Sequence, residues 1–170
     1  MQARARLQGA IDEHSGLLEV VEATAVVICQ ELSARTVTVT LLKDDMYRDI
    51  VKVGDYDPAE SIDVREQYPA FNYPEATARL LANQAYVSSD STRDIHHEHL
   101  QIVPEELVSG FLGVPIVADG QVRGEVFATR RAAEPPFTAD DVEVARDLAT
   151  QLGGRFPTLL AEYALANPDW

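Results

Sequence analysis

Cysteine and lysine are both scarce in this chain, and each scarcity excludes a class of protein. Cys29 is the one cysteine among 170 residues, so no internal disulfide can form, which is typical of proteins in a reducing compartment. Lys43 and Lys52 are the two lysines, and the formal net charge is -14. Because binding to nucleic acid or to an anionic membrane depends on clustered Lys and Arg, we expect neither as a direct partner.

Long hydrophobic runs are also absent. No apolar run approaches the length that a transmembrane helix needs, and residues 1–6 lead into an amphipathic pattern instead of the core of a signal peptide. The chain has no internal repeat and no Ser/Gly-rich linker, and 170 residues suffice for one sizeable core. We therefore predict a single cytoplasmic domain over residues 1–170.

The motifs of common catalytic sites are missing as well. The sequence has no Gly-x-Ser-x-Gly motif and no Gly-rich phosphate-binding loop. Cys29 lies in an apolar run of a predicted helix, where a buried and unreactive thiol is the usual outcome. The acidic pairs at 44–45, 105–106 and 140–141 are explained as turn and helix-capping residues. We predict no catalytic residue and a protein that is not an enzyme.

The sequence does contain a clear hairpin and helix in its second half. Two apolar runs within residues 109–130 flank Asp119 and Gly120, a dipeptide that readily takes the positive φ angles of a tight turn. Thr138 can cap the helix that follows, and Asp140 and Asp141 place negative charge in its first turn.

These segments carry a resemblance to a known family. Residues 111–131 (FLGVPIVADGQVRGEVFATRR) and 136–153 (PFTADDVEVARDLATQLG) resemble the second half of a GAF domain. The resemblance implies a module that senses a small molecule or dimerises, usually without catalysis of its own. It leaves the ligand and any cofactor unknown, because fold and chemistry are separable.

A long helix is predicted near each end of the chain. The N-terminal segment 1–33 contains a helix over about residues 5–32, and the C-terminal segment 138–166 contains one over about residues 139–164 that Gly153, Gly154 and Pro157 interrupt. The first helix has apolar residues in heptad steps of four and three. They are Leu7, Ile11, Leu18, Val21, Ala25, Ile28 and Leu32, with His14 at the missing step.

The sheet and the pocket segments are predicted between these helices, over residues 36–130. Strands are expected over residues 36–42, 46–53 and 85–88, and Pro74 begins a short helix at 75–82. This order of elements matches the GAF family. It predicts an α+β fold with an antiparallel sheet of five to six strands, terminal helices on one face, and short helices and loops forming a pocket on the other. By analogy we expect a homodimer through the terminal helices.

Candidate ligand-binding residues come from the middle of the chain. Arg93 can pair with an anionic ligand, and the aromatic residues can stack on a planar one. In the alternative interpretation the aromatic residues fill the core and the charged residues face solvent. The candidates are Tyr68, Phe71, Tyr73, Asp90, Arg93, His96, His99 and Phe111.

A cluster of histidines at 96, 97 and 99 suggests a metal or haem site. Adjacent imidazoles seldom converge, and a helical pair at His96 and His99 lacks the further ligands that a metal needs. Some haem-binding GAF domains have an axial histidine shortly before a motif like residues 111–115, but the matching position here lies near Glu105. We predict no metal site, and a haem sensor is the minor hypothesis.

Two functions therefore remain open. One is a sensory domain that binds a small molecule and controls an output domain of a bacterial signalling protein by a population shift. The other is a ligand-free dimerisation module. A sensor requires a closable pocket near residues 68–99, whereas a pure dimerisation module fills that space with Tyr68, Phe71, Tyr73 and Phe111. Because no output domain is present in these 170 residues, we expect a fragment of a longer protein rather than a standalone regulator.

Overall fold

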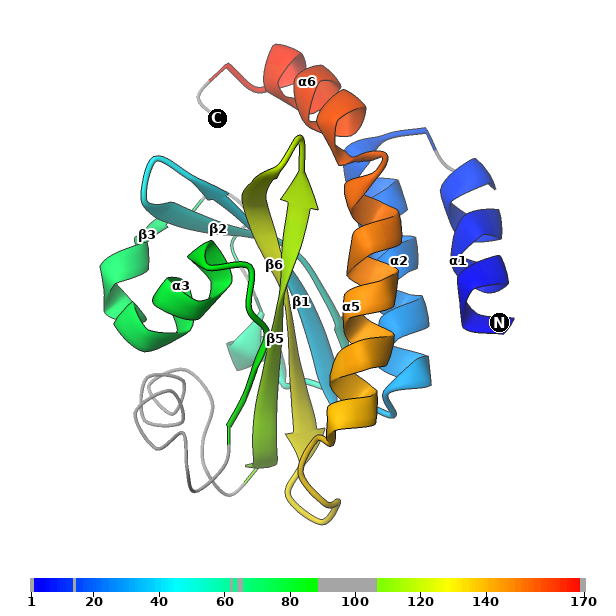
Figure 1. The fold of residues 1–170 in the computed structure, drawn as a ribbon, viewed down its shortest axis with the longest axis vertical. Coiled ribbons are helices and arrows are strands. Elements are labelled where there is room, and N and C mark those ends of the chain that lie inside the picture. Colours follow the sequence, from blue (N-terminus) through cyan, green and yellow to red (C-terminus); the bar gives the residue numbers. More distant parts are fainter. Residues whose placement is uncertain (1, 14, 62, 64–65, 89–106, 169–170) are drawn as a thin grey trace.

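An antiparallel sheet of six strands runs through the middle of the molecule (Figure 1). The computed structural model describes residues 2–13, 15–61, 63, 66–88 and 107–168. Neighbouring strands pair in the order β3-β2-β1-β6-β5-β4, which confirms the predicted α+β fold. The strands are β1 Thr36–Lys43, β2 Met46–Gly54, β3 Tyr68–Pro69, β4 Tyr86–Val87, β5 Val108–Ala118 and β6 Gln121–Arg131.

Two hairpins, β1–β2 and β5–β6, form the centre of this sheet and meet where β1 pairs with β6. Asp44 and Asp45 close the first hairpin with φ angles of 51° and 60°, and Asp119 and Gly120 close the second with 51° and 71°. Positive φ at both central residues gives a turn whose twist matches that of the flanking strands. Both predicted hairpins are confirmed.

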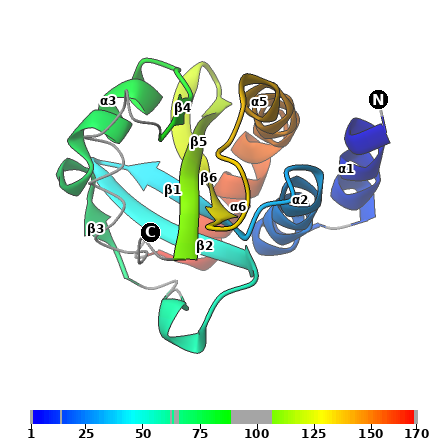
Figure 2. The same cartoon turned by 90° about the horizontal axis from the view of Figure 1, so that it is seen from below.

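The terminal helices cover one face of the sheet (Figure 2). α2 (Leu17–Glu31) and α5 (Ala139–Gly153) pack on the strands. α1 (Gln2–Glu13) packs on α2 and α5, and α6 (Phe156–Ala166) follows α5 at the end of the chain. The predicted side of the sheet for the terminal helices is therefore confirmed.

The larger apolar core lies between this helical layer and the sheet. Alternation along β1 directs Val37, Val39 and Leu41 toward the helices, where all three are fully buried. Ile28 of α2 and Leu148 of α5 meet them from the other side. Each such side chain stabilises the fold by roughly 1.5–3 kcal/mol, so this layer supplies most of the hydrophobic stabilisation.

The N-terminal helix differs from the prediction of one continuous helix over residues 5–32. α1 ends at Glu13 and α2 begins at Leu17, with Gly16 in an extended conformation before it. The break lets α1 lie against α2 and α5, where Leu7 and Ile11 are buried. The predicted heptad pattern is therefore two separate apolar stripes, one on each helix. Just after the break Leu17 is buried, whereas Leu18, which the heptad pattern included, is 40% exposed.

The interruption predicted in the C-terminal helix is confirmed. α5 ends at Gly153, and Pro157 lies in the first turn of α6, where a missing backbone N–H costs nothing. Gly153 packs directly on the backbone carbonyl of Val117, and a side chain at this position would collide with it. The glycine thus allows the end of α5 to approach β5 closely.

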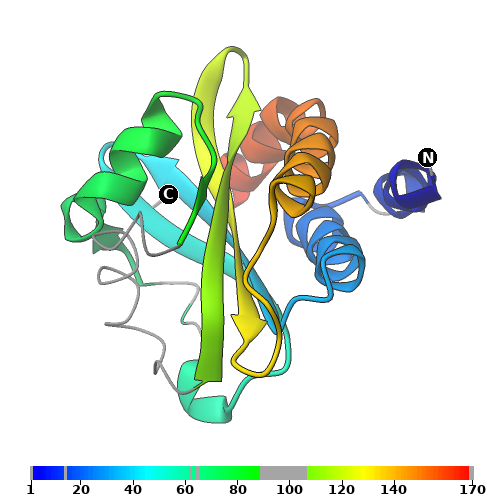
Figure 3. The same cartoon turned by 60° about the horizontal axis from the view of Figure 1, so that its bottom comes forward.

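Short elements cover the opposite face of the sheet (Figure 3). They are the 3-10 turns η1 (Pro58–Glu60) and η2 (Ala70–Asn72), the helix α3 (Pro74–Leu81), and the edge strands β3 and β4. The short helix predicted after Pro74 is confirmed. Within the described ranges, every helix is too short or too polar to cross a membrane.

Replacing Thr138 with alanine tests the helix cap that begins α5. The Asp141 N–H donates to the Thr138 hydroxyl at 3.3 Å, and the Thr138 N–H donates to the Asp141 carboxylate at 2.8 Å. Loss of such a cap costs about 1 kcal/mol, so Thr138→Ala should lower the free energy of unfolding in urea by that amount. Thr150→Ala, on the exposed side of the same helix, is the matched control. An equal loss in both variants would contradict the cap assignment.

Candidate functional site

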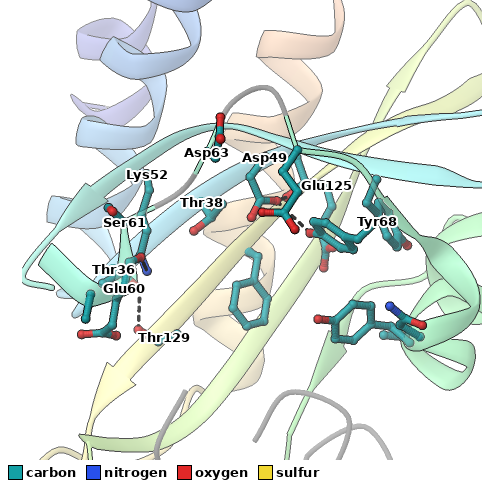
Figure 4. A pocket seen from close by; sticks show the side chains of 18 residues that line it. Thr36, Thr38, Asp49, Lys52, Glu60, Ser61, Asp63, Tyr68, Glu125 and Thr129 are labelled. Carbon is teal, nitrogen blue, oxygen red and sulfur yellow. Dashed lines mark hydrogen bonds between the residues drawn. The ribbon is translucent and has the colours of Figure 1, made fainter. Parts of the chain in front are cut away.

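A cavity of about 390 Å³ lies on the face of the sheet opposite α2 and α5 (Figure 4). Strands β1, β2 and β6 form its floor. Residues 59–61, 63 and 66 line one part of the wall, and β3, η2 and α3 line another. The cavity is therefore enclosed by the elements that connect the first hairpin to α3.

The floor of the cavity is polar although it is buried. The alternation that directs valines toward the helices directs Thr36, Thr38 and Thr40 of β1 into the cavity, and all three are buried. Thr36 pairs with Thr129 of β6, and their hydroxyl oxygens lie 2.7 Å apart in a hydrogen bond. On this face of β1 and β6, hydroxyl groups therefore occupy positions where apolar side chains would form a second hydrophobic core.

Two carboxyl groups lie in one row across this floor. Thr40 of β1 pairs with Asp49 of β2 on one side and with Glu125 of β6 on the other. The Thr40 hydroxyl donates to Asp49 Oδ1 at 2.7 Å, and the Tyr68 hydroxyl donates to the same oxygen at 2.8 Å. Tyr86 of β4 donates to Glu125 Oε1 at 2.5 Å. Each carboxyl group is thus held in place through one of its oxygens.

A glycine makes the second of these contacts possible. Gly113 of β5 lies beside the Tyr86 ring and the Glu125 carboxyl group, and a Cβ atom at this position would overlap both. Because glycine has no side chain, the tyrosine of the edge strand reaches across β5 to the carboxyl group on β6.

Burial changes the protonation of both acids. Loss of contact with water raises the pKa of Asp49, although hydrogen bonds from Thr40 and Tyr68 partly oppose the rise. Burial also raises the pKa of Glu125 to about 8, with Asp49 adding repulsion and the Tyr86 hydrogen bond lowering it. Glu125 is therefore mainly neutral at pH 7. The pKa values of Tyr68 and Tyr86 are also raised, mostly by burial, so both hydroxyls remain donors.

The other end of the cavity is organised by charged groups. Lys52 pairs with Thr38 in the strand register, and its Nζ donates to the Glu60 carbonyl at 2.6 Å. Arg35 binds the Glu60 carboxylate through two hydrogen bonds of 2.9 and 2.6 Å. The hydrogen bond from Arg35 holds the pKa of Glu60 near 2, and burial lowers the pKa of Lys52. These contacts fix η1 against the sheet.

A β-bulge brings Asp49 and Lys52 to the same face. Thr40 pairs with Asp49, but Val39 pairs with Val51, so Ile50 is an extra residue on β2. Without an extra residue, positions 49 and 52 would point to opposite faces of the strand. The bulge therefore allows both side chains to line one cavity.

The structure separates the aromatic residues predicted for the site. Tyr68 and Tyr73 line the cavity and, with Tyr47, form a cluster whose ring centroids are 5.7–6.4 Å apart. Phe71 is 77% exposed and lies outside the lining. Phe111 is fully buried and stacks on Phe127 at 5.7 Å. Phe127, which was not predicted, lines the cavity itself.

The remaining candidates fall outside the described residues. They are Asp90, Arg93, His96 and His99, and the haem hypothesis depends on the same segment. In the part of the chain that the structure describes, no group of three or more His, Cys, Asp or Glu side chains is arranged to hold a metal ion. Cys29 lies on α2, across the sheet from the cavity, and its thiol donates to the Ala34 carbonyl at 3.4 Å.

Sequence reasoning missed the polar floor and both carboxyl groups. The alternating threonines of β1 served only to predict a strand, because alternation does not show whether the polar face of a strand meets solvent or a cavity. Asp49 and Glu125 are 76 residues apart and come together only through the pairing of both strands with β1. A weak signal did exist, since Glu125 interrupts the otherwise apolar and small residues 124–128 of β6.

The raised pKa of Glu125 predicts a specific dependence of stability on pH. The folded state holds a proton that the unfolded state releases above its pKa near 4.5, so stability falls as pH rises from about 4.5 to about 8. Glutamine cannot ionise, so Glu125→Gln should lose about 2 kcal/mol less of its free energy of unfolding than the wild type between pH 6 and 8.5. Urea unfolding at both pH values measures this, with Glu143→Gln on the exposed side of α5 as control. Parallel pH profiles for wild type and Glu125→Gln would contradict the assignment.

Comparison with solved structures agrees with this architecture. The GAF domain of an Acinetobacter phosphoenolpyruvate-protein phosphotransferase superposes with a TM-score of 0.73 at 16% identity, covering 94% of this chain and 92% of that one. The corresponding Coxiella burnetii domain gives 0.73 at 16% identity, with 96% and 95% covered. The chromophore-binding domain of a bacteriophytochrome from R. palustris gives 0.73 at 13% identity, covering 95% of this chain and 60% of that one.

A comparison with curated protein sequences gives no match. A match to the family model named GAF domain, in contrast, extends over residues 16–156, from the residue before α2 to the start of α6. It includes every described residue that lines the cavity. This chain therefore belongs to the GAF domain family.

Proposed function

We propose that this domain is a non-catalytic sensor that binds a small molecule in the cavity and controls an output domain of a bacterial signalling protein. GAF domains are typically sensory or regulatory modules of such proteins. The observation that carries the proposal is an open cavity of about 390 Å³ whose floor is polar and buried. The single cysteine and the acidic charge agree with a cytoplasmic location for this signalling protein.

The lining is unfavourable for a domain that has only a structural role. Burying hydroxyl and carboxyl groups without full hydrogen bonding costs stability, and apolar side chains at the same positions would pack more favourably. A ligand that pairs with Thr38, Asp49 and Glu125 compensates this cost when it binds. Tyr68 and Tyr73 add flat surfaces for a planar part of the ligand.

The alternative, a ligand-free dimerisation module, has less support. It requires Tyr68, Phe71, Tyr73 and Phe111 to fill the space, but Phe71 points away from the lining and Phe111 lies in the core. The two tyrosines line the cavity without closing it.

The sheet itself offers a route from the cavity to the output. Thr38 and Thr40 of β1 face the cavity, and Val39 between them packs on the helical layer. A ligand that favours one arrangement of this strand therefore favours one arrangement of α2 and α5, and a connected output domain follows by a population shift.

We also propose that these domains form homodimers through the terminal helices. Among the described residues, seven large hydrophobic side chains are exposed, and four of them lie on α2, α5 or α6. These four are Leu18, Val26, Val144 and Leu165. These side chains would favour a protein–protein contact if they are joined in one apolar patch, which is what the dimer requires.

A cavity-filling substitution tests the sensory function. Thr38→Phe places a ring in space that is open in the wild type, so it should leave the circular dichroism spectrum unchanged and abolish ligand binding. Native mass spectrometry of the purified chain, beside a denatured control, reports any retained molecule. A thermal-shift screen of metabolites on both proteins reports weaker ligands. A wild-type protein with no retained molecule and no stabilising metabolite would favour the dimerisation module.

Substitution of Leu165 tests the dimer. This side chain is 86% exposed on α6, so Leu165→Glu should leave the monomer folded and weaken self-association by at least tenfold. Light scattering over a range of protein concentrations measures the association. Phe71→Glu, at an exposed apolar residue far from the terminal helices, is the matched control. Equal association of wild type and both variants would argue against this interface.

A further inference from the structure

We propose that the ligand of this cavity is a small organic cation whose N–H groups bind Asp49 and Glu125, as those of an amidinium, a guanidinium or a protonated amino-heterocycle can. This inference rests on the proposed sensory function and specifies its ligand. It depends on three features of the cavity. They are two carboxyl groups with hydrogen bonds from the described residues to only one oxygen each, an acidic lining, and an aromatic wall.

In the described part of the chain, the first feature is a pair of carboxyl groups in one row of the sheet, each with one oxygen free to accept. Asp49 uses Oδ1 to accept from Thr40 and Tyr68, and Glu125 uses Oε1 to accept from Tyr86. Among the described residues, no donor binds Asp49 Oδ2 or Glu125 Oε2. Both side chains line the cavity (Figure 4), and in the strand register they flank Thr40. Two carboxyl groups that face one cavity suit a cation that offers more than one N–H donor.

The second feature is the charge of the lining. Among the described residues, the lining contains five carboxyl groups and one ammonium group, that of Lys52. Arg35 neutralises Glu60 through two hydrogen bonds, and the Lys52 Nζ donates to the Glu60 carbonyl. Acidic side chains still outnumber basic ones in the described lining, although the charge of Lys52 also acts on Asp49. The potential in the cavity therefore favours a cation and opposes an anion.

The third feature is the aromatic wall beside the carboxyl groups. The rings of Tyr68 and Tyr73 line the cavity 5.8 Å apart, and Phe127 lines it from β6. Cations bind the faces of such rings, and a planar cation also stacks on them. The same wall accommodates the apolar part of an aryl or alkyl cation, so charge and shape select the same class of ligand.

Protonation of the site fits this assignment. Burial raises the pKa values of Asp49 and Glu125 because their hydrogen bonds, and for Asp49 the charge of Lys52, compensate the negative charge only in part. A bound cation supplies the remaining compensation and allows both groups to ionise. Titrations at pH 8, near the pKa of Glu125, therefore populate the form that binds.

Three probes of one shape and different charge test the inference. Benzamidinium, benzamide and benzoate share a phenyl ring with a planar substituent and carry positive, neutral and negative charge. Each is titrated at pH 8 into the ¹⁵N-labelled chain while amide chemical shifts are recorded. We expect benzamidinium to change the amide chemical shifts of residues in β1, β2 and β6. Its affinity should be at least tenfold higher than that of benzamide, and the difference from benzoate should be larger still.

Two conservative variants assign the contact. Asp49→Asn and Glu125→Gln keep the shape of each side chain and remove its charge, so each should weaken benzamidinium at least tenfold and leave benzamide unchanged. Glu143→Gln on the exposed side of α5 is the matched control. Amide spectra of the free variants verify that they are folded.

Several results would overturn the inference. They are equal or tighter binding of benzamide or benzoate, benzamidinium binding that both variants leave unchanged, and no binding of any probe at 10 mM, a concentration about tenfold above the ~1 mM dissociation constant of a weak ligand. None of these results decides the sensory function. That function depends on the retained molecule, the metabolite screen and Thr38→Phe, so the two proposals can fail separately.

Discussion

The structure depends on the fact that β1 is buried on both of its faces. As the strand between β2 and β6, it has no exposed edge, and it is covered by helices on one side and by the cavity wall on the other. A strand in this position is usually apolar throughout. Here Val37 and Val39 serve the helical side, while Thr36, Thr38 and Thr40 serve the other. One strand thus separates a hydrophobic core from a polar interior.

This division explains how a domain with a hollow interior remains stable. The helical layer and its side of the sheet hold the large fully buried side chains, such as Ile28, Leu148 and Phe156. A smaller cluster around Phe111 and Phe127 supports the other face. Because most of the hydrophobic burial occurs on one side, the polar side can keep Asp49 and Glu125 where a purely structural core would exclude them.

Much of the fold could be predicted from local sequence, and little of the site could. The turn at Asp119, the cap at Thr138 and the start of α3 at Pro74 each depend on the chemistry of a few adjacent residues. The break before Leu17 was missed because a heptad pattern does not record which neighbour each stripe contacts. The carboxyl row was missed because it depends on the register of three strands and on a glycine in a fourth.

The bulge at Ile50 has a consequence for comparisons within this family. Before the bulge the odd-numbered positions of β2, such as Asp49, face the cavity. After it the even-numbered positions, such as Lys52, do so. In a relative of equal length whose β2 pairs evenly, the residue aligned with Val51 would face the cavity, and the one aligned with Lys52 would face the helices. Within β2, cavity-lining positions can therefore be transferred between distant relatives by sequence alignment only up to Asp49, unless the bulge is known to be shared.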